Sequence, residues 1–454
     1  MDRTTETLAS YASSLSYEQL TPAAIHCTRR LWLDSLGCAI GGYDSEPAQI
    51  ARRLAARSSG TPAARVWGSG AATSMEAATF ANTIMVRYLD FNDMYISLEA
   101  GHASDMLPAL LAVAEAHGCT GRELVTASAV ACEMFTALAD TFSLWNKGWD
   151  HGLLVCLGTA AGVGKLLGLD IRKMGEALSL AITANLPLRQ TRSGELSMWK
   201  GCATSASARA GLFAAQLAAE GMTGPLEAFE GRHGLWEQVT KPFTLDALGA
   251  AGKGFGVERL ALKYFPTEGH SQLPLYFAIK ALEQMEVGDI ESVLVTVYRF
   301  AFTEIGSELQ KWDPQTRETA DHSLPYMLAA ALQDGRIDVQ TFGEERIRDP
   351  ALRPLMNRIK IVESPSFSSR YPIEMPCKLE IVSRSGKRFE EEGNYPRGHH
   401  KNPLTDAEVN AKFKTQCEGR LPAGRQDAVM DAVWRLGESG AIESIIDSMV
   451  IDVA

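Results

Sequence analysis

The sequence predicts a mostly α-helical protein, with a large all-helical domain and a smaller α/β lid domain inserted into it. Two patterns along the 454-residue chain support this fold class. Residues 1–258 follow a helical rhythm throughout, whereas short segments between residues 259 and 400 alternate with the two-residue period of strands. Helical pattern returns after Pro403. We therefore assign residues 1–258 and 401–454 to the helical domain and residues 259–400 to the lid.

The helical domain is expected to be built around helices that are buried on all sides. Thr21 and Pro22 form an N-cap followed by proline at the first helical position, and they predict a helix that ends near Gly41. Four later segments are apolar or small on every face: Ala77–Val86, Met106–Ala114, Gly152–Gly164 and Gly201–Ala219. Such segments predict central helices, and the spacing of Gly158 and Gly162 favours close packing between two of them.

The lid is expected to contain a small sheet. Its predicted strands are Ser292–Tyr298, Asn357–Val362 and Lys378–Ser383. A short apolar helix is predicted over Ser323–Gln333, between the first two strands. Two further helices, over Thr405–Cys417 and Gln426–Leu436, are expected to pack back onto the helical domain, which would make the α/β part an insertion.

Composition excludes several classes of function. The chain has 55 acidic and 44 basic residues, a formal net charge of −11, so we expect no nucleic-acid partner. The longest stretch without an ionisable residue, Gly152–Gly164, is shorter than the ~20 residues that span a bilayer, so we expect no membrane partner. The start of the chain lacks a signal pattern, and the eight cysteines form no CxxC pair. These features indicate a cytoplasmic protein with buried thiols and no cysteine-bound metal.

Potentially cationic side chains stand repeatedly just before an apolar helix. These residues are His102, His151, Lys200, His270 and His322. A helix N-terminus is itself partly positive, so a cation there is locally unfavourable unless both face an anion. Any one of the five is explained as a neutral capping or packing residue. Together they indicate a site that binds a small polyanion, such as a carboxylic acid with several carboxylates.

Four further polar residues are candidates for the same site. Asp90 and Asp93 follow the buried segment Ala77–Val86, where a carboxylate could orient or charge a histidine or act as a base, although an Asx turn explains one of the pair. Lys263 lies where helical pattern changes to strands, a suitable place for a cleft ligand, or else a solvated lysine. Tyr326, one turn into the helix after His322, offers a hydroxyl donor, or is a core aromatic.

Seven stretches spread over nearly the whole chain make it resemble the MmgE/PrpD family. They are RYLDFNDMY (87–95), GHASDMLPALLAVAE (101–115), WDHGLLV (149–155), MWKGCA (198–203), KYFPTEGHSQ (263–272), DHSLPYMLA (321–329) and YPRGHHKNP (395–403). The family includes 2-methylcitrate dehydratase, cis-aconitate decarboxylase and an iminodisuccinate epimerase. The resemblance implies a helical domain with an α/β lid, an active site between them, a homodimer and no metal.

The same resemblance implies which residues form the active site. The family positions fall on Asp90, His102, His151, Lys200, Lys263, His270 and Tyr326. Two positions depart from the family pattern, in which threonine stands where this chain has Met94 and proline where it has Ala103. Met94 removes a hydroxyl that could touch the substrate, so it bears on the identity of the acid.

From these residues we expect a cofactor-independent lyase that dehydrates a small tricarboxylate of the 2-methylcitrate type. Lys200, Lys263 and His270, with His322, would bind carboxylates, and His102, held by Asp90, would remove a proton. His151 or Tyr326 would protonate the leaving hydroxyl.

The same site could instead serve an epimerase, an isomerase or a decarboxylase, and family resemblance does not choose between them. A non-catalytic carboxylate-binding protein is a further alternative, which the retention of Asp90 and His102 disfavours. An aconitase-like iron–sulfur mechanism is disfavoured because the chain has no cysteine cluster.

Overall fold

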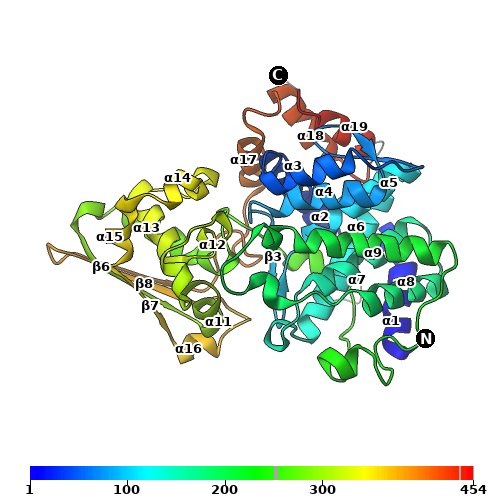
Figure 1. Ribbon diagram of the computed structural model, residues 1–454, viewed down its shortest axis with the longest axis horizontal. Coiled ribbons are helices and arrows are strands. Elements are labelled where there is room, and N and C mark those ends of the chain that lie inside the picture. The colour runs from blue at the N-terminus through cyan, green and yellow to red at the C-terminus, as the bar shows by residue number, and fades with distance from the viewer. Residues whose placement is uncertain (250–253, 439–440, 453–454) are drawn as a thin grey trace.

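The chain folds around two large hydrophobic cores. The structure is a computed structural model that describes residues 1–249, 254–438 and 441–452. The first core takes its residues from the N-terminal part as far as Leu262 and again from Leu404 onwards. The second is built almost entirely from residues between Ala261 and Phe389. The two cores correspond to two lobes that lie side by side, the larger on the right of Figure 1.

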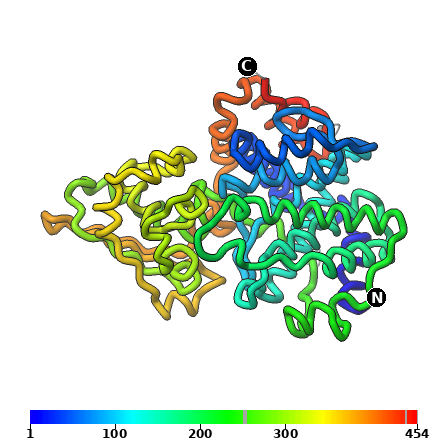
Figure 2. Tube along the Cα trace, viewed as in Figure 1, coloured from blue at the N-terminus to red at the C-terminus, as the bar shows by residue number. Residues whose placement is uncertain are grey.

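The larger lobe is helical, and the protein as a whole is mostly α. Its helices are α1 (Arg3–Ser14), α2 (Pro22–Gly41), α3 (Glu46–Ala55), α4 (Met75–Arg87), α5 (Leu107–His117), α6 (Gly121–Thr141), α7 (Gly152–Leu166), α8 (Ile171–Ala184), α9 (Ala203–Ala219), α17 (Asp406–Cys417), α18 (Ala423–Trp434) and α19 (Ala441–Ser448). The two helices predicted after Pro403 are confirmed, and in Figure 2 they pack beside the N-terminal helices.

The four predicted segments form α4, α5, α7 and α9, but α9 is not buried on every side, since its Arg209 and Phe213 are exposed. Helix α7 is buried from Gly152 to Gly164, because no face of it carries a charge before Lys165. A Cβ at Gly158 would lie 2.3 Å from the Met106 sulfur, and one at Gly162 would lie 2.7 Å from a Leu110 methyl. The two glycines therefore allow α7 to pack closely, as their spacing predicted.

The smaller lobe contains a four-stranded sheet. Its strands are β6 (Ile290–Val297), β7 (Ile359–Glu363), β8 (Cys377–Ser383) and β9 (Arg388–Gly393), in the order β7-β6-β8-β9. Strand β6 pairs with β7 in parallel, Val295 opposite Ile361, and with β8 in antiparallel, Val295 opposite Leu379. The three predicted strands are confirmed. Strand β9 was missed because a run of glutamates hides its alternation.

Helices pack against this sheet and continue the lobe. They are α10 (Gln272–Ala281), α11 (Arg299–Ala301), α12 (Arg317–Ala320), α13 (Leu324–Asp334), α14 (Glu344–Ile347), α15 (Arg353–Met356) and α16 (Pro365–Ser368). The predicted helix after His322 is α13, whose N-cap Ser323 accepts a hydrogen bond from the Tyr326 N–H. Alternate residues of β8 are buried, as expected for a strand with one face on a core.

A three-stranded sheet that the sequence did not predict joins the two lobes. It consists of β4 (Ala100–Gly101), β3 (Asp93–Ile96) and β5 (Ala261–Leu262), in that order. Strand β3 pairs with both neighbours in antiparallel. Because β3 follows Asp90, β4 precedes His102 and β5 precedes Lys263, this sheet brings three of the candidate site residues together.

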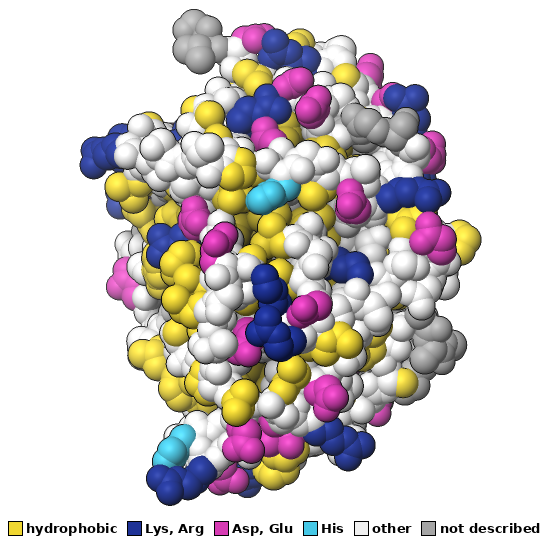
Figure 3. Space-filling view, turned by 90° about the vertical axis from the view of Figure 1, so that its right-hand side faces the viewer, with side chains coloured by type: hydrophobic (Ala, Val, Ile, Leu, Met, Phe, Trp, Pro, Cys, Tyr) yellow, Lys and Arg dark blue, Asp and Glu magenta, His cyan; other side chains and the backbone are white. Residues whose placement is uncertain are grey.

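The surface and the cysteines agree with the composition. Among the residues that the structure describes, one helix, α6, is long and apolar enough to cross a membrane, but 83% of its most apolar window is buried inside the fold. All eight cysteines are free, and all but Cys27 and Cys119 are buried. Figure 3 shows one face of the larger lobe, on which the described acidic and basic side chains are interspersed. Strands β1 (Ala64–Arg65) and β2 (Ala72–Thr73) pair in antiparallel and form a separate two-stranded sheet.

Candidate active site

A polar cavity is lined by residues of both lobes. It encloses about 490 Å³ of space outside the protein atoms, part of it open to solvent. The larger lobe contributes Arg87, Asp90, Met94, Ile96, Ala100, Gly101, His102, His151, Arg189 and Arg192. The smaller lobe contributes Lys263, Glu268, Gly269, His270, Phe300, Glu304 and His322. The four histidines predicted from the starts of helices therefore meet in one place.

Asp90 is the centre of a buried ion network beneath the cavity. Its carboxylate lies 3.0 Å from Arg87 Nη1 and 2.8 Å from Lys200 Nζ, and it accepts a further hydrogen bond from Lys263 Nζ. Its φ of +52° is unusual for a residue other than glycine and marks a tight turn after α4. Burial alone would raise the pKa of Asp90, but the surrounding cations hold it well below its usual range.

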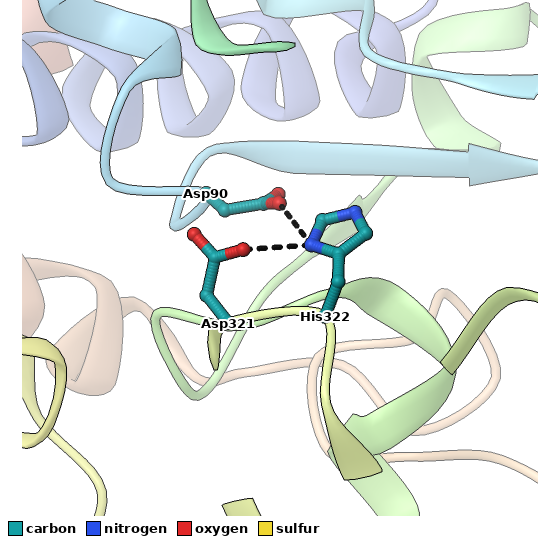
Figure 4. A group of neighbouring side chains, drawn as sticks. All are labelled: Asp90, Asp321 and His322. Atoms are coloured by element: carbon teal, nitrogen blue, oxygen red, sulfur yellow. Dashed lines mark hydrogen bonds and ion pairs between the residues drawn. The ribbon is translucent and has the colours of Figure 1, made fainter. Parts of the chain in front are cut away.

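Asp321 and His322 complete this network from the smaller lobe. Asp321 accepts hydrogen bonds of 2.9 and 3.1 Å from Lys200 Nζ, and His322 Nδ1 lies 2.7 Å from the Asp321 carboxylate. Figure 4 shows Nδ1 turned towards Asp321 and Asp90, which lies 3.8 Å away, and the other ring nitrogen turned away. His322 is therefore oriented by Asp321, and its Nε2 is left as a hydrogen-bond acceptor.

The same three side chains could in principle bind a metal ion. Ligand atoms of Asp90, Asp321 and His322 all lie within 4.8 Å of one another. The ammonium of Lys200, however, already stands between the two carboxylates and supplies the positive charge that a cation would bring. The cluster fits an internal ion network better than a metal site.

His102 is held by the backbone and not, as we predicted, by Asp90. Its Nδ1 lies 2.6 Å from the carbonyl oxygen of Asp93, which can only accept, so Nδ1 carries the proton and Nε2 does not. The Asp93 carboxylate accepts the backbone N–H groups of Ala103 and Ser104, ten and eleven residues further along the chain, so these contacts of Asp93 are not the local Asx turn that we predicted for one of the pair. Burial and the nearby Arg87 hold the pKa of His102 well below its ordinary value, so the ring is neutral.

His151 lies beside His102, and its environment also keeps it neutral. The two rings meet edge to face with centroids 5.7 Å apart. Arg192 approaches His151 Nε2 at 3.4 Å and pairs with Asp150 at 2.6 Å. Burial lowers the pKa of His151 to about 3, although Asp150 opposes the shift. Its Nε2 is therefore an acceptor directed at a guanidinium.

His270 and Glu268 form the opposite wall. His270 Nδ1 is hydrogen-bonded to the buried Tyr298 hydroxyl, and its Nε2 lies 3.7 Å from Glu268 Oε1. The other carboxylate oxygen of Glu268 accepts the His270 N–H at 2.7 Å. Burial raises the pKa of Glu268 to about 8, with Lys263 opposing the shift, so the carboxyl is mostly protonated at neutral pH.

Two predicted residues do not face the cavity in the part of the chain that is described. The Tyr326 hydroxyl donates to Thr341 O at 2.6 Å in the core of the smaller lobe, so the core explanation holds for it. Lys200 is buried below the cavity and is saturated by two carboxylates. The interpretation of Lys200 as a direct ligand of the substrate is corrected to a residue that neutralises Asp90 and Asp321.

Sequence reasoning missed several lining residues. Arg87 and Glu268 lie in stretches that carry the family resemblance, next to residues that were selected, so proximity could have found them. Arg189, Arg192 and Glu304 lie in loops or irregular turns outside those stretches, where there is no periodic signal to find them. Arg189 and Glu304 form a 2.8 Å ion pair.

Comparison with known proteins identifies the family. The MmgE/PrpD N-terminal domain matches residues 6–248, and the MmgE/PrpD C-terminal domain matches residues 265–436. The chain belongs to the MmgE/PrpD family. Both matched domains thus contribute residues to the cavity. The lining residues divide between the two matched regions, and Lys263 lies just before the second.

Members of the MmgE/PrpD family with named activities are similar over most of their length. The 2-methylcitrate dehydratase of Escherichia coli (strain K12) is 27% identical, over 92% of this chain and 91% of that protein. The 2-methylcitrate dehydratase of Cupriavidus necator is 28% identical, over 92% and 90%. The cis-aconitate decarboxylase of Mus musculus is 25% identical, over 95% and 90%. The similarity supports a family-level dehydratase or decarboxylase.

Proposed function

We propose that this protein is a lyase that dehydrates a small tricarboxylate of the 2-methylcitrate type without a metal or organic cofactor. The observation that carries the proposal is the neutral His102, whose unprotonated Nε2 lines a cavity rich in fixed positive charge. The names of the similar dehydratases support the reaction type. A neutral histidine beside carboxylate-binding groups suits removal of a proton next to a carboxylate.

Substrate carboxylates would bind to cations and N–H groups that converge on the cavity. Lys263 and Arg192 supply positive charge, and His270, with the Tyr298 hydroxyl donating to its Nδ1, would supply an Nε2–H. His102 and His151 stand directly before helical segments, so backbone N–H groups there add to the positive potential. A preorganised donor of this kind is worth roughly 3–4 kcal/mol of barrier.

In the proposed reaction, His102 Nε2 removes a proton from the carbon next to a substrate carboxylate. The electrons of that C–H bond form the carbon–carbon double bond as the C–O bond of the hydroxyl breaks. Charge that builds up on the carboxylate is stabilised by Lys263 and the other cations of the cavity. The leaving hydroxyl takes a proton and departs as water, and exchange with solvent restores the proton balance of the site.

Glu268 is the better proton donor for the leaving hydroxyl. It lines the cavity and is protonated near neutral pH because burial raises its pKa to about 8. His151 has its Nε2 lone pair directed at Arg192, and burial lowers its pKa to about 3. The Tyr326 hydroxyl is engaged with Thr341. We therefore replace the expectation of His151 or Tyr326 as the acid with Glu268.

The lid and the homodimer are part of the same proposal. A cavity lined from two lobes supports a smaller lobe that closes over the substrate. The helices α3, α4 and α9 lie side by side, with Leu54 and Phe213 more than half exposed, which supports association with a second copy. Light scattering at the concentration used for activity tests the dimer: a mass equal to one chain contradicts it.

Product analysis tests the reaction. The purified protein is incubated separately with 2-methylcitrate, citrate, cis-aconitate and iminodisuccinate, and each mixture is followed by NMR. We expect a conjugated enoic acid from 2-methylcitrate, which also absorbs in the ultraviolet. Release of carbon dioxide from cis-aconitate would identify a decarboxylase, and inversion without a new double bond would identify an epimerase. Binding of the acids without any change in them would instead identify a binding protein.

A further inference from the structure

An ion pair connects the two lobes across the cavity. Arg189 Nη2 of the larger lobe lies 2.8 Å from Glu304 Oε2 of the smaller lobe, and both residues line the cavity. The side chains are 15% and 18% exposed, so the pair is shielded from most of the solvent but not buried in a core. An ion pair in such a place can be reached by a ligand that enters the cavity.

Each partner stands on a short helical turn at the boundary between the lobes. The Arg189 N–H donates to Gly148 O at 2.9 Å, at the start of the short helical turn Arg189–Arg192 (η4). Glu304 lies in the π-helical turn Phe302–Gly306 (η10), which directly follows the short helix α11 that contains Phe300. The Phe300 ring packs edge to face on Trp145 of the larger lobe, with centroids 4.8 Å apart. The backbone thus holds Arg189 in place while its partner belongs to the other lobe.

Arg189 differs from the other described cations that line the cavity. Arg87 and Lys263 are paired with Asp90, and Arg192 is paired with Asp150, and both of these carboxylates are almost completely buried. Those counter-ions are permanent, because an ionised carboxylate left without partners in the interior is strongly destabilising. Glu304 can turn into the cavity or towards solvent when Arg189 finds another anion.

We propose that Arg189 binds a substrate carboxylate and that Glu304 is an internal competitor that occupies Arg189 until the substrate displaces it. The inference rests on the proposed function only in requiring a carboxylate substrate. A guanidinium binds carboxylates in a planar, bidentate manner, so one carboxylate can replace another at the same atoms. An acid with several carboxylates compensates the displacement with its other contacts, whereas a monocarboxylate does not. The pair therefore selects for polycarboxylates.

Calorimetric titration with tricarballylate (propane-1,2,3-tricarboxylate) tests the proposal. This acid carries no hydroxyl group, so it cannot be dehydrated during the measurement. The proteins are the wild type, Arg189→Gln, Glu304→Gln, the double variant, and Arg336→Gln as a control for loss of an exposed arginine. We expect Arg189→Gln to weaken binding about 10-fold or more, since a charge-assisted pair is lost. We expect Glu304→Gln to tighten it several-fold, and the double variant to match Arg189→Gln.

The two single variants are expected to change the affinity for tricarballylate in opposite directions, and this distinguishes competition from a structural role of the ion pair. If the pair only held the lobes together, both single variants would weaken binding, and that result overturns the proposal. It is likewise overturned if Arg189→Gln binds as tightly as the Arg336→Gln control. If the variants bind tricarballylate in the expected pattern but the wild type turns over none of the tested acids, the proposed reaction is refuted and this inference stands. A wild type that binds no tricarballylate would refute both.

Discussion

Replacing Glu268 by Gln removes the group we propose as the proton donor while preserving its size. In the wild type, one carboxylate oxygen accepts the His270 N–H, and the other lies 3.7 Å from His270 Nε2. The amide oxygen of glutamine can keep the first contact, so the fold should be retained. We expect kcat to fall by about 10²–10⁴, the usual contribution of a general acid.

Because the pKa of Glu268 is raised, this substitution should also change how the free energy of unfolding depends on pH. Burial raises the pKa of Glu268 from 4.5 to about 8, so between these pH values the folded state keeps a proton that the unfolded state loses. The contribution of Glu268 to stability therefore falls as the pH rises, by about 1.4 kcal/mol per unit. Between about pH 5 and 8 the wild type should lose about 4 kcal/mol relative to Glu268→Gln, which cannot titrate.

Urea denaturation of both proteins at several pH values from 5 to 8 measures this difference. Glu283→Gln, at an exposed position, is the matched control and should follow the wild type. In addition, wild-type kcat/KM should decline above about pH 8, where Glu268 loses its proton, and the residual activity of Glu268→Gln should lack that decline. A stability difference that does not change with pH would refute the assignment of a protonated Glu268.

Three further substitutions test other parts of the site. His102→Ala should lower kcat by about 10²–10⁴ with an unchanged denaturation midpoint, and near-normal turnover would remove His102 from the mechanism. Asp90→Asn removes the carboxylate that Arg87, Lys200 and Lys263 share, while Lys200 keeps Asp321, and should lower the free energy of unfolding by about 3–5 kcal/mol in urea titrations; an unaltered value would contradict the ion network. Gly101→Ala would place a methyl group 2.9 Å from a carbon of the His151 ring, so KM for 2-methylcitrate should rise; unchanged kinetics would show that the ring position is unimportant.

The sequence predicted the elements whose signal is local. Helices such as α7 were found because an uncharged segment of helical length has few alternatives to the interior of a helical domain. Strand β8 was found because its buried residues alternate strictly. The sheet of β3, β4 and β5 was missed because strands of two to four residues have no measurable period. The pairing of β3 with β5 also joins residues about 170 positions apart, such as Asp93 and Leu262.

The candidate site was found in part by the same local reasoning. Each of the four histidines stands at or just before the start of a helical segment, which the sequence reveals, and the fold brings these four starts to one cavity. The partners of these residues could not be predicted, since they depend on long-range geometry. His102 turns to the Asp93 carbonyl because β3 and β4 form a tight hairpin, and Asp90 is left to face Lys200 and Lys263.

A crystal structure of the protein with bound tricarballylate tests most directly whether this cavity accepts a polycarboxylate with its reacting carbon at His102. We expect density for the acid between the lobes, one carboxylate on Arg189 with Glu304 displaced, and a methylene carbon near His102 Nε2. Density for the acid only outside the cavity, or within it but far from His102, would contradict the proposed chemistry.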